Sequence, residues 1–391
     1  MIPIDIVTSD SKLPDRAAVV VIGGGIAGVC TALELAERRI DVVLVEKGEI
    51  GAEQSGRNWG WCRQMGRDPR EIPLILRSLE LWQGMAARIG ADVGFNRCGI
   101  VYLCETDAQL AAKTRWYEET GKPHGLETRL ISPAEAAELM PGTAGNWLGG
   151  LFSPADGRAE PFIAAPAIAR GARRAGARIF TGCAARGLET RAGRVSAVVT
   201  EKGTIQCDTA VLAGGAWSRR FCHNIGVRLP QLGVINSVMR TVPFDAGLPH
   251  SASGGGFSLR KRGDGGYTIA HQHSSVADIV PDSFRLFLDF LPALKLDWKG
   301  LKLRLGRRFI DEARLARRWR LDEVSPFEQV RILDPDPVDP ILDQAAANLA
   351  RWFPAFRDVQ IAGRWAGLID AMPDVVPVIS AAVGIEGLYL A

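Results

Sequence analysis

Three glycines and one acidic residue near the N-terminus have the spacing of a dinucleotide-binding motif. Gly23, Gly25 and Gly28 occupy the positions of G-x-G-x-x-G, and Glu46 follows 23 residues after the first glycine. The first glycine permits a tight turn, the second lets the backbone approach a pyrophosphate, and the third lets a helix pack closely on a strand. An acidic side chain at this distance accepts hydrogen bonds from a ribose. The pattern therefore predicts a binding site for an adenine dinucleotide.

The residues around these glycines predict the strand, helix and second strand that the motif requires. Ala18–Ile22 is a short apolar run, typical of a strand buried on both faces of a parallel sheet. The helix after the turn has an apolar face that includes Ala27 and Leu33, and its N-terminus would direct free N–H groups at the phosphates. Val42–Val45 predicts the second strand, which ends at Glu46. Because every element falls in place, we prefer a nucleotide site to an ordinary turn.

The loop after the second strand carries the residues best suited to binding a substrate carboxylate. Lys47–Asp68 is rich in glycine and long for such a connection, and long ordered loops are usually functional. Arg63 is the first candidate, because a planar guanidinium can donate to both carboxylate oxygens. The alternative roles for Arg63 are a contact with a cofactor phosphate and simple exposure to water. Arg57 competes for the carboxylate, and Arg260, expected on a hairpin, is a weaker candidate.

Two tryptophans in this loop, Trp59 and Trp61, are candidates for the walls of a substrate pocket. There they would exclude water and offer π faces to a cationic nitrogen. Packing in the core is the alternative and the commoner role of tryptophan.

Length and composition favour a globular protein of two or three domains. The 391 residues are 47% hydrophobic and 23% charged, with no run of 18 or more apolar residues that would span a membrane. The N-terminal residues lack the basic and apolar regions of a signal peptide. Seven cysteines without a C-x-x-C pair favour reduced thiols in the cytoplasm and no metal site.

Positive charge is concentrated in one segment. The net charge is only +3, yet Lys295–Arg320 holds ten Lys or Arg residues against three Asp or Glu. Such a segment could contact an anionic partner, whether nucleic acid or membrane. The alternative is a solvated helix face, and apolar residues such as Leu301 and Phe309 favour packing on the protein or on a partner subunit. We expect no binding of nucleic acid at physiological salt.

Two further motifs extend the first into a family resemblance. An apolar strand at Cys207–Ala213 runs into Gly214 and Gly215 within VLAGGAWS, and GRWAGLIDAMPDVVPVIS follows near the end of the chain. With VVVIGGGIAG and Glu46, these motifs resemble the FAD-dependent superfamily of D-amino-acid oxidase, glycine oxidase and sarcosine oxidase. The chain is most similar to the branch of opine oxidases and proline dehydrogenase β-subunits, and the likeness covers nearly its whole length.

The resemblance implies an α/β (α+β overall) fold in which a Rossmann-like FAD-binding domain is interleaved with a smaller substrate domain built on an antiparallel sheet. We expect residues 1–88, 150–231 and 360–391 to form the FAD-binding domain. Residues 89–149 and 232–359 would form the substrate domain, with a helical insertion near 281–325. Within the substrate domain, Phe257–Lys261 and Tyr267–His271 predict a hairpin around Gly263–Gly266.

The resemblance also implies which residues contact the cofactor. It selects FAD over free NAD, a choice that the glycine motif alone does not make. No cysteine follows Cys222, so a flavin thioether near the third motif is not supported and we expect non-covalent FAD. The expected FAD ligands are Gly23, Gly25, Ile26, Ala27, Gly28, Glu46, Lys47, Ser55, Arg57, Asn58, Gly214, Gly215, Trp217, Gly367 and Asp374.

The chain departs from the family pattern in two places. Glycine-oxidase-like members carry an Arg shortly after W-x-G, whereas Trp365-Ala366-Gly367 is followed here by Leu368. The chain also ends at Ala391 in an apolar strand, where relatives continue with a glycine-rich segment and a helix. We expect either that the natural chain is longer or that part of the cofactor site is missing.

The implied activity is oxidation of a C–N bond by hydride transfer to FAD, with few protein groups needed beyond those that hold the substrate. The loop Arg57–Gln64 contains no acidic residue to hold a primary ammonium, which favours a secondary or N-substituted amino acid such as an opine, an N-alkyl glycine or a cyclic imino acid. Alternatives are a D-amino-acid dehydrogenase and a tRNA-modification-associated FAD oxidoreductase whose basic segment contacts RNA. A partner subunit or a separate electron acceptor is also expected.

Overall fold

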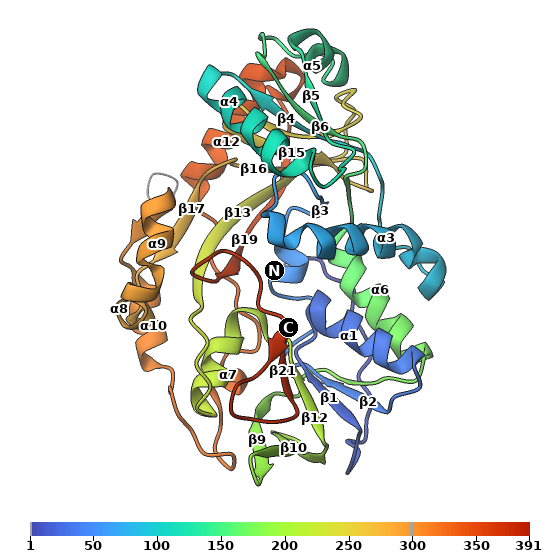
Figure 1. The fold of residues 1–391 in the computed structure, drawn as a ribbon, viewed down its shortest axis with the longest axis vertical. Coiled ribbons are helices and arrows are strands. Elements are labelled where there is room, and N and C mark those ends of the chain that lie inside the picture. Colours follow the sequence, from blue (N-terminus) through green and yellow to red (C-terminus); the bar gives the residue numbers. More distant parts are fainter. Residues whose placement is uncertain (1, 298–300) are drawn as a thin grey trace.

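The computed structural model describes residues 2–297 and 301–391, and within them two large sheets organise the chain (Figure 1). One is a six-stranded, mostly parallel sheet, which we call the parallel sheet. The other is a ten-stranded, mostly antiparallel sheet, which we call the mixed sheet. The expected α/β fold with a dinucleotide-binding sheet and a second, largely antiparallel sheet is confirmed.

The parallel sheet is built around the first apolar run of the sequence. Its strand order is β20-β21-β12-β1-β2-β8, and β20 alone runs antiparallel to its neighbour. Every residue of β1 and β2 is buried, as the continuous apolar runs predict. The strands are β1 (Val19–Ile22), β2 (Val42–Val45), β8 (Arg178–Phe180), β12 (Thr209–Leu212), β20 (Ser380–Ala381) and β21 (Leu388–Leu390).

Helices and a small sheet cover the two faces of the parallel sheet. Helices α1 (Ile26–Glu37) and α6 (Pro161–Arg174) pack on one face, where Val29, Leu33 and Ile168 are fully or almost fully buried. On the other face, Trp217 and Phe221 pack with Val20 and Leu212. That side also carries α7 (Ser218–Asn224), α11 (Pro326–Gln329) and an antiparallel sheet of β9 (Ala185–Arg191), β10 (Arg194–Thr200) and β11 (Gly203–Gln206).

The mixed sheet lies at the other end of the molecule (Figure 1). Its longest pairing is antiparallel, between β13 (Leu232–Thr241) and β19 (Ile361–Ala371). The predicted hairpin is confirmed as β15 (Phe257–Lys261) and β16 (Tyr267–Ala270). The remaining strands are β4 (Ile100–Cys104), β5 (Arg129–Ile131), β6 (Gly149–Ser153), β14 (Ser251–Gly254), β17 (Ser275–Asp278) and β18 (Leu301–Arg304).

The other helices pack on the sheets or extend from their edges. Helix α12 (Asp339–Trp352) buries Leu342 and Leu349 against the mixed sheet. The rest are α2 (Gln54–Arg57), α3 (Ile72–Ile89), α4 (Asp107–Trp116), α5 (Pro133–Leu139), α8 (Pro281–Arg285), α9 (Phe287–Asp297) and α10 (Arg307–Arg314). Two short strands, β3 (Trp61–Cys62) and β7 (Gly157–Arg158), pair with each other. No helix in the described ranges is both long and apolar enough to cross a membrane.

Sheet membership differs from the expected domain division at three points. Strand β6 was expected in the FAD-binding segment 150–231, yet it pairs with β4 and β5 in the mixed sheet. Strand β19 was expected in segment 360–391, yet it pairs with β13. The insertion near 281–325 holds α8, α9 and α10 but also β18, where Leu301-Lys302-Leu303-Arg304 alternates with the period of a strand and pairs with β17.

The basic segment Lys295–Arg320 is partly neutralised within the fold, and its residues 298–300 lie outside the described residues. Arg304 pairs with Asp278 at 2.6 Å, and Arg308 lies 3.7 Å from Glu312. Glu312 also pairs with Arg220 of α7. These contacts support the interpretation of the segment as a helix and strand packed on the protein.

Candidate functional site

A cavity of about 860 Å³ runs from the glycine turn of the parallel sheet to the mixed sheet. Its lining combines segments that are far apart in the sequence, because the ends of β1, β2 and β12 meet the loop after β2 and the strands β13 and β19 there. The volume lies within the range of cofactor and ligand sites. Lining residues from the two ends include Gly23, Gly25, Gly214 and Gly215 on one side and Asn236, Val238, Ser253, Gln272 and His273 on the other.

The glycine turn leaves room for a ligand at one position only. Gly23 has a φ of +110°, and a Cβ there would lie 2.3 Å from the carbonyl oxygen of Ala213. A Cβ on Gly28 would lie 1.9 Å from the carbonyl oxygen of Gly23. A Cβ on Gly25, by contrast, would meet only Ser55 Oγ, at 3.1 Å, and Gly25 lines the cavity. Gly23 and Gly28 therefore serve close packing, while the backbone of Gly25 is open to a ligand.

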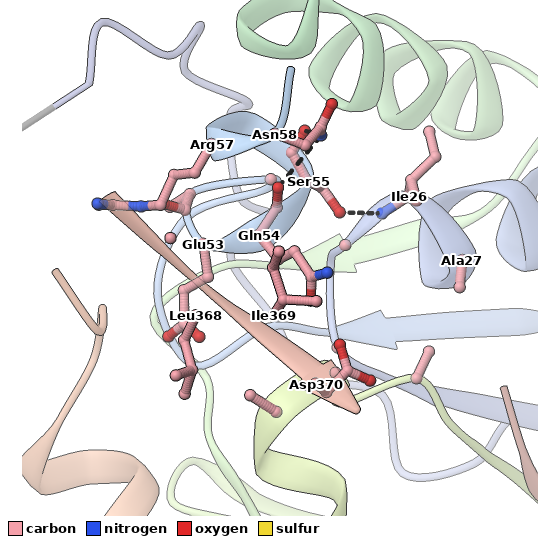
Figure 2. Close-up of a pocket in the computed structure, with 18 of the residues that line it drawn as sticks. Ile26, Ala27, Glu53, Gln54, Ser55, Arg57, Asn58, Leu368, Ile369 and Asp370 are labelled. Atoms are coloured by element: carbon pink, nitrogen blue, oxygen red, sulfur yellow. Dashed lines mark hydrogen bonds between the residues drawn. The ribbon is translucent and has the colours of Figure 1, made fainter. Parts of the chain in front are cut away.

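Ser55 completes the N-terminus of α1. The N–H of Ile26 donates to Ser55 Oγ at 2.8 Å, as Figure 2 shows, and Gly25 precedes the helix without a capping side chain. Ile26, Ala27 and Ser55 all line the cavity. A helix N-terminus that faces a cavity attracts phosphate groups through its free N–H groups and its dipole.

Glu46 lies at the end of β2, at the position expected for a ribose contact. Its carboxylate accepts the N–H groups of Gly24 at 2.6 Å and Gly48 at 2.7 Å. Burial raises the pKa of Glu46, and the charge of Lys47 opposes that shift. Each oxygen keeps acceptor capacity beyond its one backbone bond, so the side chain can also accept ribose hydroxyls.

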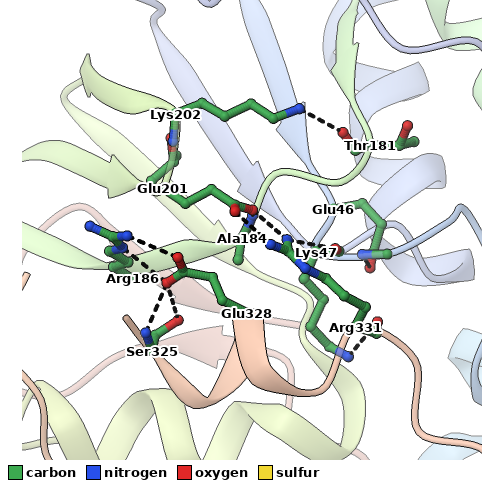
Figure 3. A network of polar contacts seen from close by, with 12 residues as sticks. Glu46, Lys47, Thr181, Ala184, Arg186, Glu201, Lys202, Ser325, Glu328 and Arg331 are labelled. Carbon is green, nitrogen blue, oxygen red and sulfur yellow. Dashed lines mark hydrogen bonds and ion pairs between the residues drawn. The ribbon is translucent and has the colours of Figure 1, made fainter. Parts of the chain in front are cut away.

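Lys47 and Trp217 line the cavity but direct their polar atoms at Glu53, a residue that the sequence reasoning missed. Lys47 Nζ lies 2.6 Å from Glu53 Oε1, and Trp217 Nε1 donates to Glu53 Oε2 at 2.9 Å. Lys47 Nζ also donates to the carbonyl of Arg331, and Arg331 pairs with Glu201 (Figure 3). The network ties the loop after β2 to the segment after α11.

Arg57 is a buried cross-link with one donor to spare. It is 2% exposed and donates to the carbonyl of Ala52 at 2.9 Å, to the carbonyl of Ala366 at 3.0 Å and to Asp334 at 2.5 Å. Its Nη2 is buried, with no hydrogen-bond partner among the described residues. A buried unpaired donor is costly, so a ligand atom in the cavity would stabilise it. Figure 2 shows Arg57 at the end of α2, with its guanidinium directed toward β19.

Arg63 lies at the other end of the cavity, with the two tryptophans. Trp59 and Trp61 both line it and pack edge to face, with ring centroids 5.5 Å apart. Arg63 donates from Nη1 to the carbonyl of Met65 at 2.5 Å, and its guanidinium lies 5.9 Å from the centroid of the Tyr102 ring. The structure thus brings these three candidates together in one wall.

Two predicted site residues lie away from the cavity lining. Arg260 is buried and pairs with Glu160, at 2.8 Å and 3.1 Å, and it also donates to the carbonyl of Trp59. It therefore supports the loop, and it does not line the cavity in which a substrate would lie. Asp374 is more than half exposed and lies 3.0 Å from Arg70, so it is not placed to contact the cofactor.

The remaining predicted FAD ligands line the cavity, with Gly28 behind them in the turn. Asn58, Gly214, Gly215 and Gly367 all contribute to the wall. The sequence reasoning did not select several lining residues. Glu53 and Arg67 lie in the loop that it marked as functional, and the others come from elements without a motif, namely Tyr102, Lys113 and Gln272.

Comparison with solved structures finds close likeness over almost the full chain. L-amino acid deaminase from Proteus myxofaciens is 35% identical with a TM-score of 0.94, covering 99% of this chain and 88% of that one. The deaminase from Proteus vulgaris is 34% identical with the same TM-score, over 99% and 91% of the two chains.

Curated relatives match over a shorter length. Human mitochondrial dimethylglycine dehydrogenase is 30% identical over 58% of this chain and 26% of its own, so the chain spans about a quarter of that enzyme. Sarcosine oxidase subunit beta of Rhizobium meliloti is 30% identical over 54% and 52% of the two chains. Residues 18–391 match the family described as FAD dependent oxidoreductase. A glycine turn, an acidic residue at the end of β2 and a cavity shared by two sheets agree with that match, and the chain belongs to the FAD-dependent oxidoreductase family.

Proposed function

We propose that this protein uses non-covalently bound FAD to oxidise the carbon–nitrogen bond of an N-substituted or secondary α-amino acid. The observation that carries the proposal is the composition of the cavity, which has a dinucleotide cradle at one end and Arg63 at the other. A cofactor and a carboxylate could therefore be held in one enclosed space.

The residues at the cradle end fit FAD. The backbone of Gly25 and the N-terminus of α1 would hold the pyrophosphate, and Glu46 would accept from the ribose. The unpaired Nη2 of Arg57 would donate to a polar atom of the cofactor. Bound FAD supplies the acceptor for the hydride that leaves the substrate carbon.

The other end of the cavity fits the carboxylate of an amino acid. The guanidinium of Arg63 would hold both carboxylate oxygens and so orient the adjacent carbon. Trp59 and Trp61 would exclude water from that carbon. With its carboxylate held by Arg63 and its apolar groups held by the tryptophans, the substrate could adopt few orientations. Positioning the substrate in this way would be the main contribution of the protein to the reaction rate.

The charges beside Arg63 favour an uncharged amine. The described lining residues at this end include the cations Arg63, Arg67 and Lys113 but no carboxylate. Nearby positive charge lowers the pKa of an amine and favours its neutral form, from which a hydride equivalent is removed more easily. A substituted amine also has fewer N–H groups to satisfy in a pocket without an acidic acceptor.

A primary L-amino acid is the second candidate, and one observation favours it. The two Proteus enzymes that match almost the whole chain at 34–35% identity are L-amino acid deaminases. The relatives that act on N-methylated substrates by name match 54–65% of the chain. The likeness to a sarcosine oxidase subunit beta supports a partner subunit or a separate electron acceptor.

Matched substrate pairs separate the two candidates. We would mix FAD-loaded protein anaerobically with glycine or sarcosine, and with L-alanine or N-methyl-L-alanine, and follow the loss of oxidised-flavin absorbance. The proposal expects the N-methyl member of each pair to reduce the flavin at least tenfold faster at equal concentration. Faster reduction by the primary amino acids would support the deaminase-like candidate. No reduction by any α-amino acid would overturn both.

A further inference from the structure

A second, smaller cavity of about 80 Å³ lies behind one wall of the first, and arginines dominate its lining. Ala216, Trp217 and Leu368 line both cavities and so form the wall between them. The arginines come from α7, from α8 and α10, which lie side by side (Figure 1), and from the segment after α10. They are Arg219, Arg220, Arg285, Arg308 and Arg317. We call this space the arginine cavity, and its volume is several times what one water molecule needs.

Two arginines of the cavity share one carboxylate, that of Asp282. Its Oδ2 accepts a hydrogen bond from Arg219 Nε at 2.6 Å, and its Oδ1 accepts one from Arg285 Nη1 at 2.8 Å. Asp282 therefore joins α7 to α8 and holds two guanidinium groups against a single negative charge. Both oxygens are engaged, so this carboxylate is not free to neutralise a further cation.

Glu312 holds a second pair of arginines, but unevenly. Its Oε2 lies 2.5 Å from Arg220 Nη2, whereas its Oε1 lies 3.7 Å from Arg308 Nη2, beyond hydrogen-bond distance. The Arg308 side chain is only 18% exposed, and no described residue accepts a hydrogen bond from its buried Nε and Nη1. A guanidinium without acceptors is costly to bury, so an anion that gave Arg308 a partner would stabilise the fold.

The fifth arginine, Arg317, has no ion pair within the described ranges. Burial, and then the charge of Arg285, lowers the pKa of Arg317, although Asp282 opposes the shift. His223 also lines the cavity, and burial followed by the charge of Arg317 lowers the pKa of its imidazole from an ordinary value of 6.5. The imidazole is therefore neutral at pH 7. The described lining thus sets five cations against two carboxylates, which leaves three positive charges unmatched.

We propose that the arginine cavity binds a small oxyanion with two negative charges, of the phosphate class, and that Arg308 and Arg317 are its principal ligands. Such an ion offers several acceptor oxygens to guanidinium donors, and its charge offsets two of the three unmatched positive charges. The volume of the cavity accommodates one ion of this size. The inference is independent of the proposed function, because it uses neither Arg63 nor a bound substrate.

Inorganic phosphate is the probe, and the FAD-loaded protein is the sample, so that the pyrophosphate cradle is already occupied. Phosphate, sulfate and acetate would be titrated at constant ionic strength and mildly alkaline pH, where phosphate is mainly a dianion, and binding would be measured by calorimetry. We expect one saturable site with a Kd of about 1 mM or less for phosphate and sulfate, and at least tenfold weaker binding of acetate, which has a single charge. The melting temperature should rise with phosphate concentration, because the ion binds the folded state.

Variants connect the binding to the two principal ligands. Arg308→Gln and Arg317→Gln should each weaken phosphate binding tenfold or more, as the loss of a charged contact predicts. Arg307→Gln is the matched control and should stay within about twofold, since the Arg307 side chain is 91% exposed on the same helix and does not line the cavity. Without phosphate, Arg308→Gln should melt at or above the temperature of the wild type, because it removes buried donors that lack partners. A merely structural Arg308 would make that variant melt lower.

Several results would overturn the site. One is the absence of saturable phosphate binding at millimolar concentrations, and another is an affinity no higher than that for acetate. A third is an affinity that survives both Arg308→Gln and Arg317→Gln, or that falls equally in Arg307→Gln. Phosphate that binds only as FAD is released, seen as a loss of bound-flavin absorbance, would place the ion in the cradle and also contradict the inference.

Discussion

At the scale of single residues, the structure shows that the glycines of the motif have different roles. A Cβ on Gly28 would collide with the carbonyl of Gly23 at 1.9 Å, which only a backbone shift could relieve. A Cβ on Gly25 would approach the hydroxyl of Ser55 at 3.1 Å, a contact that a rotation of a side chain can relieve. One position therefore serves the fold and the other serves the ligand.

Gly25→Val should consequently lose FAD but keep its fold. The branched side chain would occupy the space in which a pyrophosphate must approach the backbone. We expect the substitution to lower the free energy of unfolding by only about 1–2 kcal/mol. Flavin fluorescence of the purified variant measures the first effect, and circular dichroism of the apoprotein measures the second. Gly28→Ala serves as the contrast, because we expect it to reduce soluble expression. Stoichiometric FAD in Gly25→Val would mean that the cradle has been misplaced.

The glycine turn and the acidic residue after β2 could be placed from the sequence because their spacing follows from local geometry. The roles of the arginines could not be predicted, because the partner of a long guanidinium side chain can lie far away in the sequence. Arg57 and Arg260 both prove to be buried cross-links, to Asp334 and Glu160 respectively. Arg67 was not selected although it lies in the same loop as Arg63, and Lys113 was missed because it lies on α4, which carries no motif.

At the scale of elements, one buried carboxylate holds the loop that carries Arg63. Asp156, in the turn between β6 and β7, accepts the N–H groups of Gln64 and Met65. Burial raises its pKa to about 6 from an ordinary value of 3.8, despite those hydrogen bonds and the charge of Arg63. The charged carboxylate of Asp156 therefore lowers the stability of the fold, but its hydrogen bonds orient the loop that carries Arg63.

The contribution of Asp156 to stability should fall as the pH rises. Between about pH 4 and pH 6 the folded state binds more protons at this group than the unfolded state, so the free energy of unfolding decreases by about 3 kcal/mol across that window and is flat above it. Urea denaturation of the wild type and of Asp156→Asn at pH 4.5, 5.5 and 7.5 measures this, since other groups cancel in the difference. A difference that does not change with pH would contradict the assignment.

Secondary structure was predictable wherever local patterns decide it. Ser132 and Glu135 form a capping box at the start of α5, which the local S-x-x-E pattern encodes. The glycine turn joins β15 to β16 as expected. Sheet membership was harder, because it depends on partners far along the chain. Strand β6 joins the mixed sheet through β4, and β19 does so through β13, which no local pattern near either strand specifies.

At the scale of the whole molecule, the cavity exists because the parallel and mixed sheets meet over one loop. The loop after β2 contributes to the cradle through Ser55 and to the opposite wall through Trp61 and Arg63. The order of motifs allowed the two-part plan to be predicted from the family resemblance. The depth and lining of the cavity depend on side chains from both sheets and needed the structure.

We expect the bound flavin to be released intact from the whole protein. In the proposed site, backbone and polar contacts would hold FAD. Cys62, the cysteine nearest Arg63 in sequence, has its pKa raised to about 12 by burial, which keeps it an unreactive thiol. Acid precipitation of purified protein should leave the yellow chromophore in the supernatant. Colour retained in the pellet would show a covalent link.

The central claim is that one cavity holds FAD at the glycine turn and a substrate carboxylate at Arg63. The most direct test is the affinity of Arg63 variants for (methylthio)acetate, a carboxylate in which sulfur replaces the amine nitrogen. Loss of a charged, forked contact of about 2–5 kcal/mol corresponds to a rise in Kd of roughly 30- to 5000-fold. Arg63→Ala should show that rise, and Arg63→Lys should recover only part of the affinity. Flavin content should equal that of the wild type in both variants. An Arg63→Ala protein that loses FAD, yet binds the ligand normally in its remaining flavin-loaded fraction, would contradict the claim.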